Sequence, residues 1–418
     1  MTKIVHAADI HLDSPMCGLS RYEGAPVSRI RGATRRALEN LVALCLEERA
    51  SLLLVAGDLY DGSWKDYATG LYFASQMSRL REAGVRVIMV RGNHDAESRI
   101  ARTLTMPDNV VTLSAKSPET LHLEDLGVAV HGQSFPDRAV TDDLAARYPD
   151  RSPGFVNVGL LHTAAEGREG HARYAPCTRA TLEGKGYDYW ALGHVHRREV
   201  LSSEPWIVFP GNLQGRHVKE TGAKGATLIT LDGGRVASVE ARTLDAVRWA
   251  HASVDATEAS AAFDVVDLAR SAVVREVTSA DGRPVAVRVH VAGASRAHGQ
   301  LATAPERWIN EVRQAANDAC GDAVWVADVK LATLPEVDAS VLAAREDAVG
   351  QLCRALAGLR SDDGARAELF AELAELARRL PPEVRGAGRA LDDPEVQRAL
   401  LDDATASLLP RLLSREDA

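Results

Sequence analysis

The chain has 418 residues, of which 46% are hydrophobic and 26% are charged. This length allows two or three domains with substantial cores. The formal net charge of −9 excludes a broadly basic surface that attracts nucleic acid non-specifically. It leaves room for a local basic groove, or for a cationic metal site that binds phosphate.

The first residues, MTKIVHAADIHLDS, lack the basic and then apolar plan of a signal peptide, and no apolar run is long enough to cross a bilayer. We therefore expect a cytoplasmic protein with no membrane contact. The five cysteines are scattered and never occur in CxxC spacing, which excludes a disulfide framework and a thiolate zinc site.

Apolar runs alternate with helical patterns through the first hundred residues. This order is typical of an α/β layer with parallel strands. Short strands separated by turn residues then continue to about residue 245, and we interpret them as a β-rich second half of the same domain. The first part is predicted to contain strands at 3–9, 51–58 and 85–95 and helices at 27–50 and 66–84.

A new pattern begins near residue 246. Strands and helices alternate again and predict a small β-α-β-α-β domain over 246–335, with helices through about 258–278 and 304–320. After Pro335 the pattern is helical, and we expect breaks at Gly364, at Pro381–Pro382 and at Pro394. The third region, 336–418, is therefore predicted to be a helical C-terminal segment.

Side chains that bind metals or carry protons follow five of the predicted strands. In open α/β sheets, ligands bind at the carboxyl ends of the strands. A single such turn is often a polar loop or surface decoration, but five together indicate one site. The residues are Asp9 and His11, Asp58 and Asp61, Asn93, His94 and Asp95, His162, and His194 and His196.

The donor atoms in this set are carboxylate oxygens, imidazole nitrogens and an amide oxygen, with no thiolate. Such donors suit Mn, Fe, Zn, Co or Ni better than a soft copper site. The set is too large for one ion, and one aspartate can bridge two ions about 3.5–4 Å apart, as in binuclear hydrolytic sites. Gly57, Gly92 and Gly193 precede the ligands, where we expect tight turns. His6, His122 and His131 lie within strand-like runs and are predicted to be structural.

The motifs DxH, GDxxD, GNHD, a lone strand-end histidine and GHxH, in this order, resemble the calcineurin-like metallophosphoesterase superfamily over about residues 1–245. The stretch FPGNLQGRHVKETGAKGATLITLD is further similar to bacterial DNA repair exonuclease subunits of the SbcD and YhaO type. The resemblance implies a two-sheet sandwich flanked by helices, with a small α+β cap domain and a helical C-terminal tail.

The resemblance also implies a role for each matching residue. Asp9, His11, Asp58 and His196 would hold one metal ion, and Asp58, Asn93, His162 and His194 a second, with Asp58 bridging. His94 would face the scissile phosphate. The cofactor would be a pair of divalent ions. We expect Mn²⁺, with Fe, Zn or Co as alternatives. Arg216, His217 and Lys219 would contact phosphate, although a solvated surface cluster is an equally good interpretation.

Asp61 departs from the pattern of many repair nucleases of this kind, which carry a histidine three residues after the bridging aspartate. A carboxylate there cannot donate a proton unless its pKa is raised, so we expect Asp61 to orient His94 instead. The cap domain would help to position DNA, or serve only for packing. The tail would contact an SMC-like coiled-coil ATPase, and a homodimer is typical of such nucleases.

Three functions remain open on the sequence alone. The favoured one is a metal-dependent phosphodiesterase that hydrolyses DNA, acting as a repair exonuclease. A phosphodiesterase or phosphatase for small nucleotides would use the same metal ligands, although the additional domain and tail argue against it. A non-catalytic subunit of an ATPase complex is the third, and the intact set of ligands argues against it.

Overall fold

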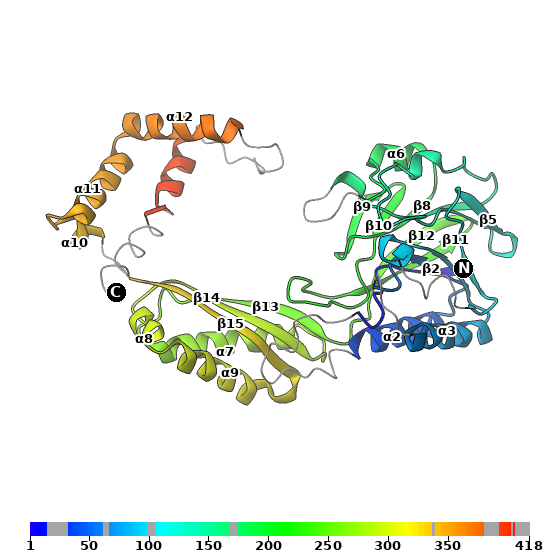
Figure 1. Ribbon diagram of the computed structural model, residues 1–418, viewed down its shortest axis with the longest axis horizontal. Coiled ribbons are helices and arrows are strands. Elements are labelled where there is room, and N and C mark those ends of the chain that lie inside the picture. Colours follow the sequence, from blue (N-terminus) through cyan, green and yellow to red (C-terminus); the bar gives the residue numbers. More distant parts are fainter. Residues whose placement is uncertain are drawn as a thin grey trace. The chain divides into compact units, whose positions relative to one another are not determined.

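The computed structural model describes residues 1–14, 32–61, 67–97, 105–167, 174–336, 339–379, 393–402 and 404–405 (Figure 1). The chain forms two compact units. The first contains Met1–Ala250, Val277–Val287 and Asp322–Ala327, and the second contains His251–Glu276, Arg288–Gly321 and Asp328–Ala418. The domain boundaries expected at 245 and 335 stay predictions.

The first unit contains a mixed sheet with the strand order β12-β11-β1-β2-β3-β4. The strands β1 to β4 run parallel, β11 is antiparallel to β1, and β12 is antiparallel to β11. The strand bounds are β1 Thr2–Ala7, β2 Leu52–Ala56, β3 Arg86–Val90, β4 Val110–Thr112, β11 Gly225–Asp232 and β12 Arg235–Thr243.

Helices α2 (Ala33–Glu47) and α3 (Tyr67–Glu82) pack against this sheet, and their apolar side chains share a core cluster with those of β1, β2 and β3. The apolar face predicted for the first helix is buried at Ala37, Leu38 and Leu41. The start of that predicted helix, residues 27–31, lies outside the described residues.

A second sheet in the same unit has the order β5-β6-β7-β8-β10-β9, with β6, β7, β8 and β10 parallel. The bounds are β5 Glu119–Leu123, β6 Val128–Gly132, β7 Val156–His162, β8 Tyr189–Gly193, β9 Glu199–Ser203 and β10 Trp206–Phe209. The edge strand β9 was not predicted, because its sequence, EVLSS, has only two apolar residues.

One hydrophobic cluster lies between the two sheets and takes side chains from strands of both, among them Ile4, Leu54 and Leu160. A second cluster covers the outer face of the second sheet, where Trp190 packs beside Leu182 of α6 (Arg179–Gly184). Because both faces of β7 and β8 are buried, apolar residues occupy both faces of each strand rather than one. The predicted two-sheet sandwich flanked by helices is confirmed.

A third sheet has the order β13-β14-β15, with helices α7, α8 and α9 between its strands in the sequence. This is the predicted β-α-β-α-β order, with α8 as an unpredicted short helix. The bounds are β13 Arg248–Asp255, α7 Ala262–Thr278, β14 Val285–Ser295, α8 His298–Thr303, α9 Pro305–Cys320 and β15 Val324–Pro335.

The C-terminal region is helical, with α10 at Ala339–Ala343, α11 at Ala348–Ser361 and α12 at Asp363–Arg379. The break expected at Gly364 lies instead at Asp362, whose side chain accepts hydrogen bonds from the peptide groups of Gly364 and Ala365. Gly364 is thus part of the first turn of α12. Pro381 and Pro382 lie outside the described residues, and Pro394 begins a helical stretch. Of the helices described, none combines the length and apolar character needed to cross a membrane.

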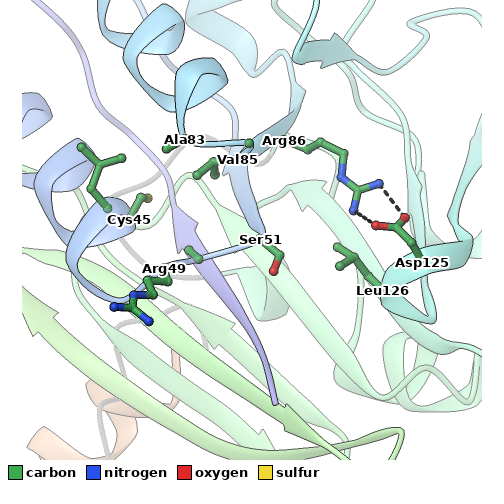
Figure 2. A pocket seen from close by; sticks show the side chains of 11 residues that line it. Cys45, Arg49, Ser51, Ala83, Val85, Arg86, Asp125 and Leu126 are labelled. Atoms are coloured by element: carbon green, nitrogen blue, oxygen red, sulfur yellow. Dashed lines mark hydrogen bonds and ion pairs between the residues drawn. The ribbon is translucent and has the colours of Figure 1, made fainter.

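A pocket of about 300 Å³ lies at the amino ends of β2 and β3, lined by Ser51 and Arg86 among others (Figure 2). The guanidinium of Arg86 donates two hydrogen bonds to the carboxylate of Asp125, so its charge is neutralised within the pocket (Figure 2). The predicted site residues follow the opposite, carboxyl ends of these strands. The pocket is therefore separate from the site.

Packing between β7 and β8 predicts the effect of a single methyl group. A Cβ at Gly159 would lie 2.3 Å from the buried ring of Trp190, whereas a Cβ at Gly184 meets nothing within 4 Å. We expect Gly159→Ala to destabilise the protein by about 1–3 kcal/mol through overpacking, and Gly184→Ala to cause no loss. Thermal unfolding followed by fluorescence measures both. Equal midpoints in the two variants would contradict this packing.

Candidate metal centre

The predicted ligands follow the carboxyl ends of strands from both sheets. Asp9 and His11 follow β1, and Asp58 follows β2. From the second sheet, His162 ends β7 and His194 follows β8. Because the two sheets pack face to face and these strands are parallel within each, their carboxyl ends bring the side chains to one edge.

A first group consists of Asp9, His11 and His196, which offer ligand atoms within 4.8 Å of one another. The Nε2 atoms of the two histidines are 3.3 Å apart, and His196 Nε2 is 3.9 Å from Asp9 Oδ1. Asp9 is held in place because both of its carboxylate oxygens accept a hydrogen bond from the peptide N–H of His194. The structure thus brings together three of the residues predicted for one ion.

A second group consists of Asp58, His162 and His194, again with ligand atoms within 4.8 Å. The Oδ1 atom of Asn93 lies 3.0 Å from His162 Nε2, so the amide joins this group. His162 is oriented by its other nitrogen, Nδ1, which is 2.9 Å from the carbonyl oxygen of Ala56. This backbone contact leaves Nε2 directed at the carboxylate of Asp58, 3.4 Å away.

Asp58 lies between the two groups. Its Oδ2 atom is 3.4 Å from His162 Nε2 in the second group and 4.0 Å from His11 Nε2 in the first. Its Oδ1 atom accepts a hydrogen bond from the peptide N–H of His94. One carboxylate that faces both groups is the geometry that a bridging ligand requires.

The charges of the site suit a cation. Burial, with the nearby carboxylate of Asp58, raises the pKa of Asp9 above its usual range, and burial raises the pKa of Asp58 to about 6. Burial lowers the pKa of His11 and lowers that of His162 to about 3, which keeps both imidazoles neutral. Neutral imidazoles are the form that binds metals, and a divalent ion would compensate the buried carboxylates. The residues present therefore fit a pair of divalent ions.

The backbone is strained at several of these residues. Asp9, His11, Asp58 and His194 all have positive φ angles, of 49°, 43°, 52° and 104°. Such conformations cost on the order of 1–3 kcal/mol each and cluster at functional sites.

The glycines that precede the ligands act in two ways. Gly57 has a positive φ of 89°, as a tight turn requires. Gly92 and Gly193 have no positive φ, so a left-handed conformation is not what requires glycine there. A Cβ would instead lie 2.3 Å from Asp58 Oδ1 at Gly92 and 1.9 Å from the carbonyl oxygen of Ala56 at Gly193. Close approach of backbone to the site, rather than a turn, requires glycine at these two positions.

His94 lies beside the metal ligands with 33% of its side chain exposed. Its Nδ1 atom is 3.1 Å from Asp61 Oδ1, and this contact raises the pKa of His94. Burial raises the pKa of Asp61, but the neighbouring His11 and the contacts of His94 and Ser14 with its carboxylate hold it far below its usual range. Asp61 is thus a carboxylate acceptor placed to orient His94.

The basic residues near the site differ in their positions. Arg216 is largely buried, and its Nη1 atom lies 3.5 Å from Asp61 Oδ2 and 3.4 Å from Ser14 Oγ. His217 and Lys219 are exposed, and His217 Nε2 is 3.5 Å from Glu220 Oε1. Of the predicted phosphate-contacting set, Arg216 is the residue that contacts Asp61, the partner of His94.

Sequence reasoning missed the role of one buried carboxylate and the presence of another at the site. Asp95 accepts hydrogen bonds from the peptide groups of Leu59, Tyr60 and Gly92 and ties the loop after β2 to the loop after β3. It had been grouped with the candidate metal-type side chains. Glu220 contacts His196 and was not identified at all. The only signal for Glu220 is that it is the one acidic residue in the basic stretch RHVKETGAK.

The predicted structural histidines are hydrogen-bonded away from the ligands. His6 lies 3.0 Å from Tyr189 Oη, His122 pairs with Ser152, and His131 pairs with Asn157. Burial lowers the pKa of His6 to about 3, so it is a neutral core residue.

Comparison with known proteins gives the family. The calcineurin-like phosphoesterase family matches residues 2–198, and the middle domain of the metallophosphoesterase YhaO matches residues 249–334. The chain is 36% identical to the uncharacterized metallophosphoesterase YhaO of Bacillus subtilis over 321 residues, 75% of each chain. This chain belongs to the calcineurin-like metallophosphoesterases.

More distant relatives of this metallophosphoesterase include the DNA double-strand break repair protein Mre11 of Methanopyrus kandleri. It is 28% identical over 272 residues, which are 57% of this chain and 56% of that protein. A crystal structure of a dimetal phosphatase from Danio rerio matches 58% of this chain and 99% of that chain, with 12% identity and a TM-score of 0.33. The family membership supports a hydrolase that acts on phosphoesters.

The contact between Asp61 and His94 predicts graded effects of substitution. Asp61→Ala removes the acceptor and is expected to lower turnover of a generic phosphodiester about 10- to 100-fold, part of the roughly 10²–10⁴-fold contribution of a positioned proton donor. Asp61→Asn retains an oxygen that can accept from Nδ1 and should lose less. Steady-state kinetics with the metal content measured in parallel tests this. Full activity in both variants would exclude an orienting role.

Proposed function

We propose that this protein is a metal-dependent phosphodiesterase that hydrolyses DNA phosphodiester bonds and acts as a repair exonuclease. The observation that most supports the chemistry is the position of the Asp58 carboxylate, which faces both groups of ligands. Two divalent ions held there would bind a phosphoryl oxygen and lower the pKa of a water molecule. We expect Mn²⁺, with Fe, Zn or Co as alternatives that the donor atoms also accept.

The residues beside the ligands have complementary roles in this proposal. His94 is hydrogen-bonded through Nδ1 to Asp61, so its Nε2 atom is left to hold a proton near the leaving oxygen. Its raised pKa favours the protonated form that a general acid needs. Arg216 adds a fixed cation beside Asp61 that can pair with a non-bridging phosphate oxygen.

DNA as the substrate is supported by the relatives and by the domain organisation. One relative carries the name of a DNA double-strand break repair protein, and residues 249–334 match the middle domain of YhaO. A single small nucleotide does not require such an additional domain. The proposal also includes a coiled-coil ATPase that binds the C-terminal helices, and a homodimer. Both rest on the resemblance alone.

Hydrolysis of two substrates by the full chain tests the proposal. With Mn²⁺, we expect cleavage of both end-labelled linear duplex DNA and bis-p-nitrophenyl phosphate, because the same ligands and His94 act on each. His94→Ala should lower both rates by about 10²–10⁴-fold. A product series that shortens from one labelled end would show an exonuclease.

The outcomes separate the alternatives. Cleavage of only the small ester would retain the metal chemistry and contradict DNA hydrolysis by the chain alone, in favour of a small nucleotide substrate or a required partner. Cleavage of neither substrate by a chain that retains bound metal would contradict the enzymatic proposal. The variant His122→Ala, which removes an exposed histidine of β5 that pairs with Ser152, is the matched control and should cleave as the wild type does.

A further inference from the structure

A segment between β10 and β11, residues 210–224, lies against the loop that carries His194 and His196. We call this segment the strap. The peptide N–H of Asn212 donates to the carbonyl oxygen of His196 at 3.3 Å, and Lys224 Nζ donates to the same oxygen at 2.7 Å. The strap is thereby fastened to the backbone of one predicted metal ligand.

Glu220 lies in the strap and is 8% exposed. Its Oε1 atom accepts a hydrogen bond from His196 Nδ1 at 2.7 Å. Its Oε2 atom accepts from Asn212 Nδ2 at 2.9 Å and from the peptide N–H of Arg216 at 2.7 Å. Two N–H groups thus occupy Oε2, and Oε1 faces His196 Nδ1.

The geometry indicates which nitrogen of His196 carries the hydrogen. Glu220 Oε1 lies 2.7 Å from Nδ1 while Oε2 accepts from two N–H groups, so the carboxylate acts as an acceptor and Nδ1 donates to it. In the neutral imidazole the lone pair is then on Nε2. Nε2 is the atom that lies 3.3 Å from His11 Nε2 and 3.9 Å from Asp9 Oδ1. Metal-binding histidines are commonly fixed in this way by a carboxylate on the other nitrogen.

A purely structural role of Glu220 can be distinguished experimentally from the orientation of His196, because Gln214 also holds the strap in place. Gln214 is buried, and its side chain donates to the carbonyl oxygen of Val247 and accepts from the peptide groups of Ala246 and Val247. None of these hydrogen bonds involves His196. Loosening the strap at Gln214 therefore leaves the Glu220–His196 hydrogen bond in place.

We propose that Glu220 is a positioning residue that holds His196 in the Nδ1–H tautomer and thereby sets the affinity of the Asp9–His11–His196 group for a divalent ion. The inference rests on the proposed metal centre and is independent of whether the substrate is DNA. It assigns a task to Glu220, the one acidic residue of the stretch RHVKETGAK.

Titration of the full chain with Mn²⁺ by calorimetry tests this inference. The wild type is expected to bind two ions. In Glu220→Ala one of the two sites should weaken by about 10- to 100-fold while the other is unchanged, the range seen when a partner of a metal-binding histidine is removed. Glu220→Gln retains an oxygen that can accept from Nδ1 and should recover part of the loss. Gln214→Ala should bind as the wild type does.

Nitrogen chemical shifts of His196 in the metal-free protein give a second readout. The wild type and Glu220→Gln should show the Nδ1–H tautomer, and Glu220→Ala a mixture. If Glu220→Ala does not fold, Glu220→Asp, whose carboxylate is too short to reach Nδ1, should weaken the same site. Wild-type affinity at both sites in the folded variants, or equal losses in Gln214→Ala and Glu220→Ala, would overturn the inference. A wild type that binds no Mn²⁺ would refute the metal centre itself and the proposed function with it.

Discussion

The site depends on one carboxylate that faces two groups of ligands. Asp58 follows a central strand of the first sheet, and its Oδ2 atom lies between His11 and His162. This position requires the two sheets to pack so that the carboxyl ends of β1, β2, β7 and β8 meet. The apolar cluster between the sheets, which includes Leu54 and Leu160, is therefore what positions the chemistry.

The favourable free energy of folding that this core contributes is partly offset by unfavourable features of the site. Buried carboxylates, neutral buried imidazoles and left-handed backbone at Asp9, His11, Asp58 and His194 are each unfavourable in isolation. Contacts from the surroundings hold them, such as the peptide N–H of His194 on Asp9 and that of His94 on Asp58. A pair of cations would convert this unfavourable arrangement of charge into a favourable one.

The order of elements and the edge that carries the site were predictable, because ligands at the ends of parallel strands need only local patterns. His162 and His194 could be placed at one edge from the ends of their strands alone. The contact of Glu220 with His196 spans 24 residues within an irregular segment, where no periodicity reports on packing. The sequence also could not show why glycine is required at positions 92 and 193. The requirement comes from atoms of Asp58 and Ala56, which are distant in sequence.

Small local errors have the same origin. Strand β9 pairs with β10 as the edge of the second sheet, and its polar residues are tolerated because an edge strand is half exposed. At the start of α12, the side chain of Asp362 determines the boundary, and Gly364 is accommodated in the first turn. In both cases a specific contact outweighed the average preference of the residues.

The central claim is that two ions share Asp58, and anomalous diffraction from crystals grown with Mn²⁺ tests it most directly. The geometry predicts two peaks about 3.5–4 Å apart, one on each side of the Asp58 carboxylate. One peak should lie near Asp9, His11 and His196, and the other near Asn93, His162 and His194. A single peak, or two peaks of which one does not contact Asp58, would contradict the bridging role.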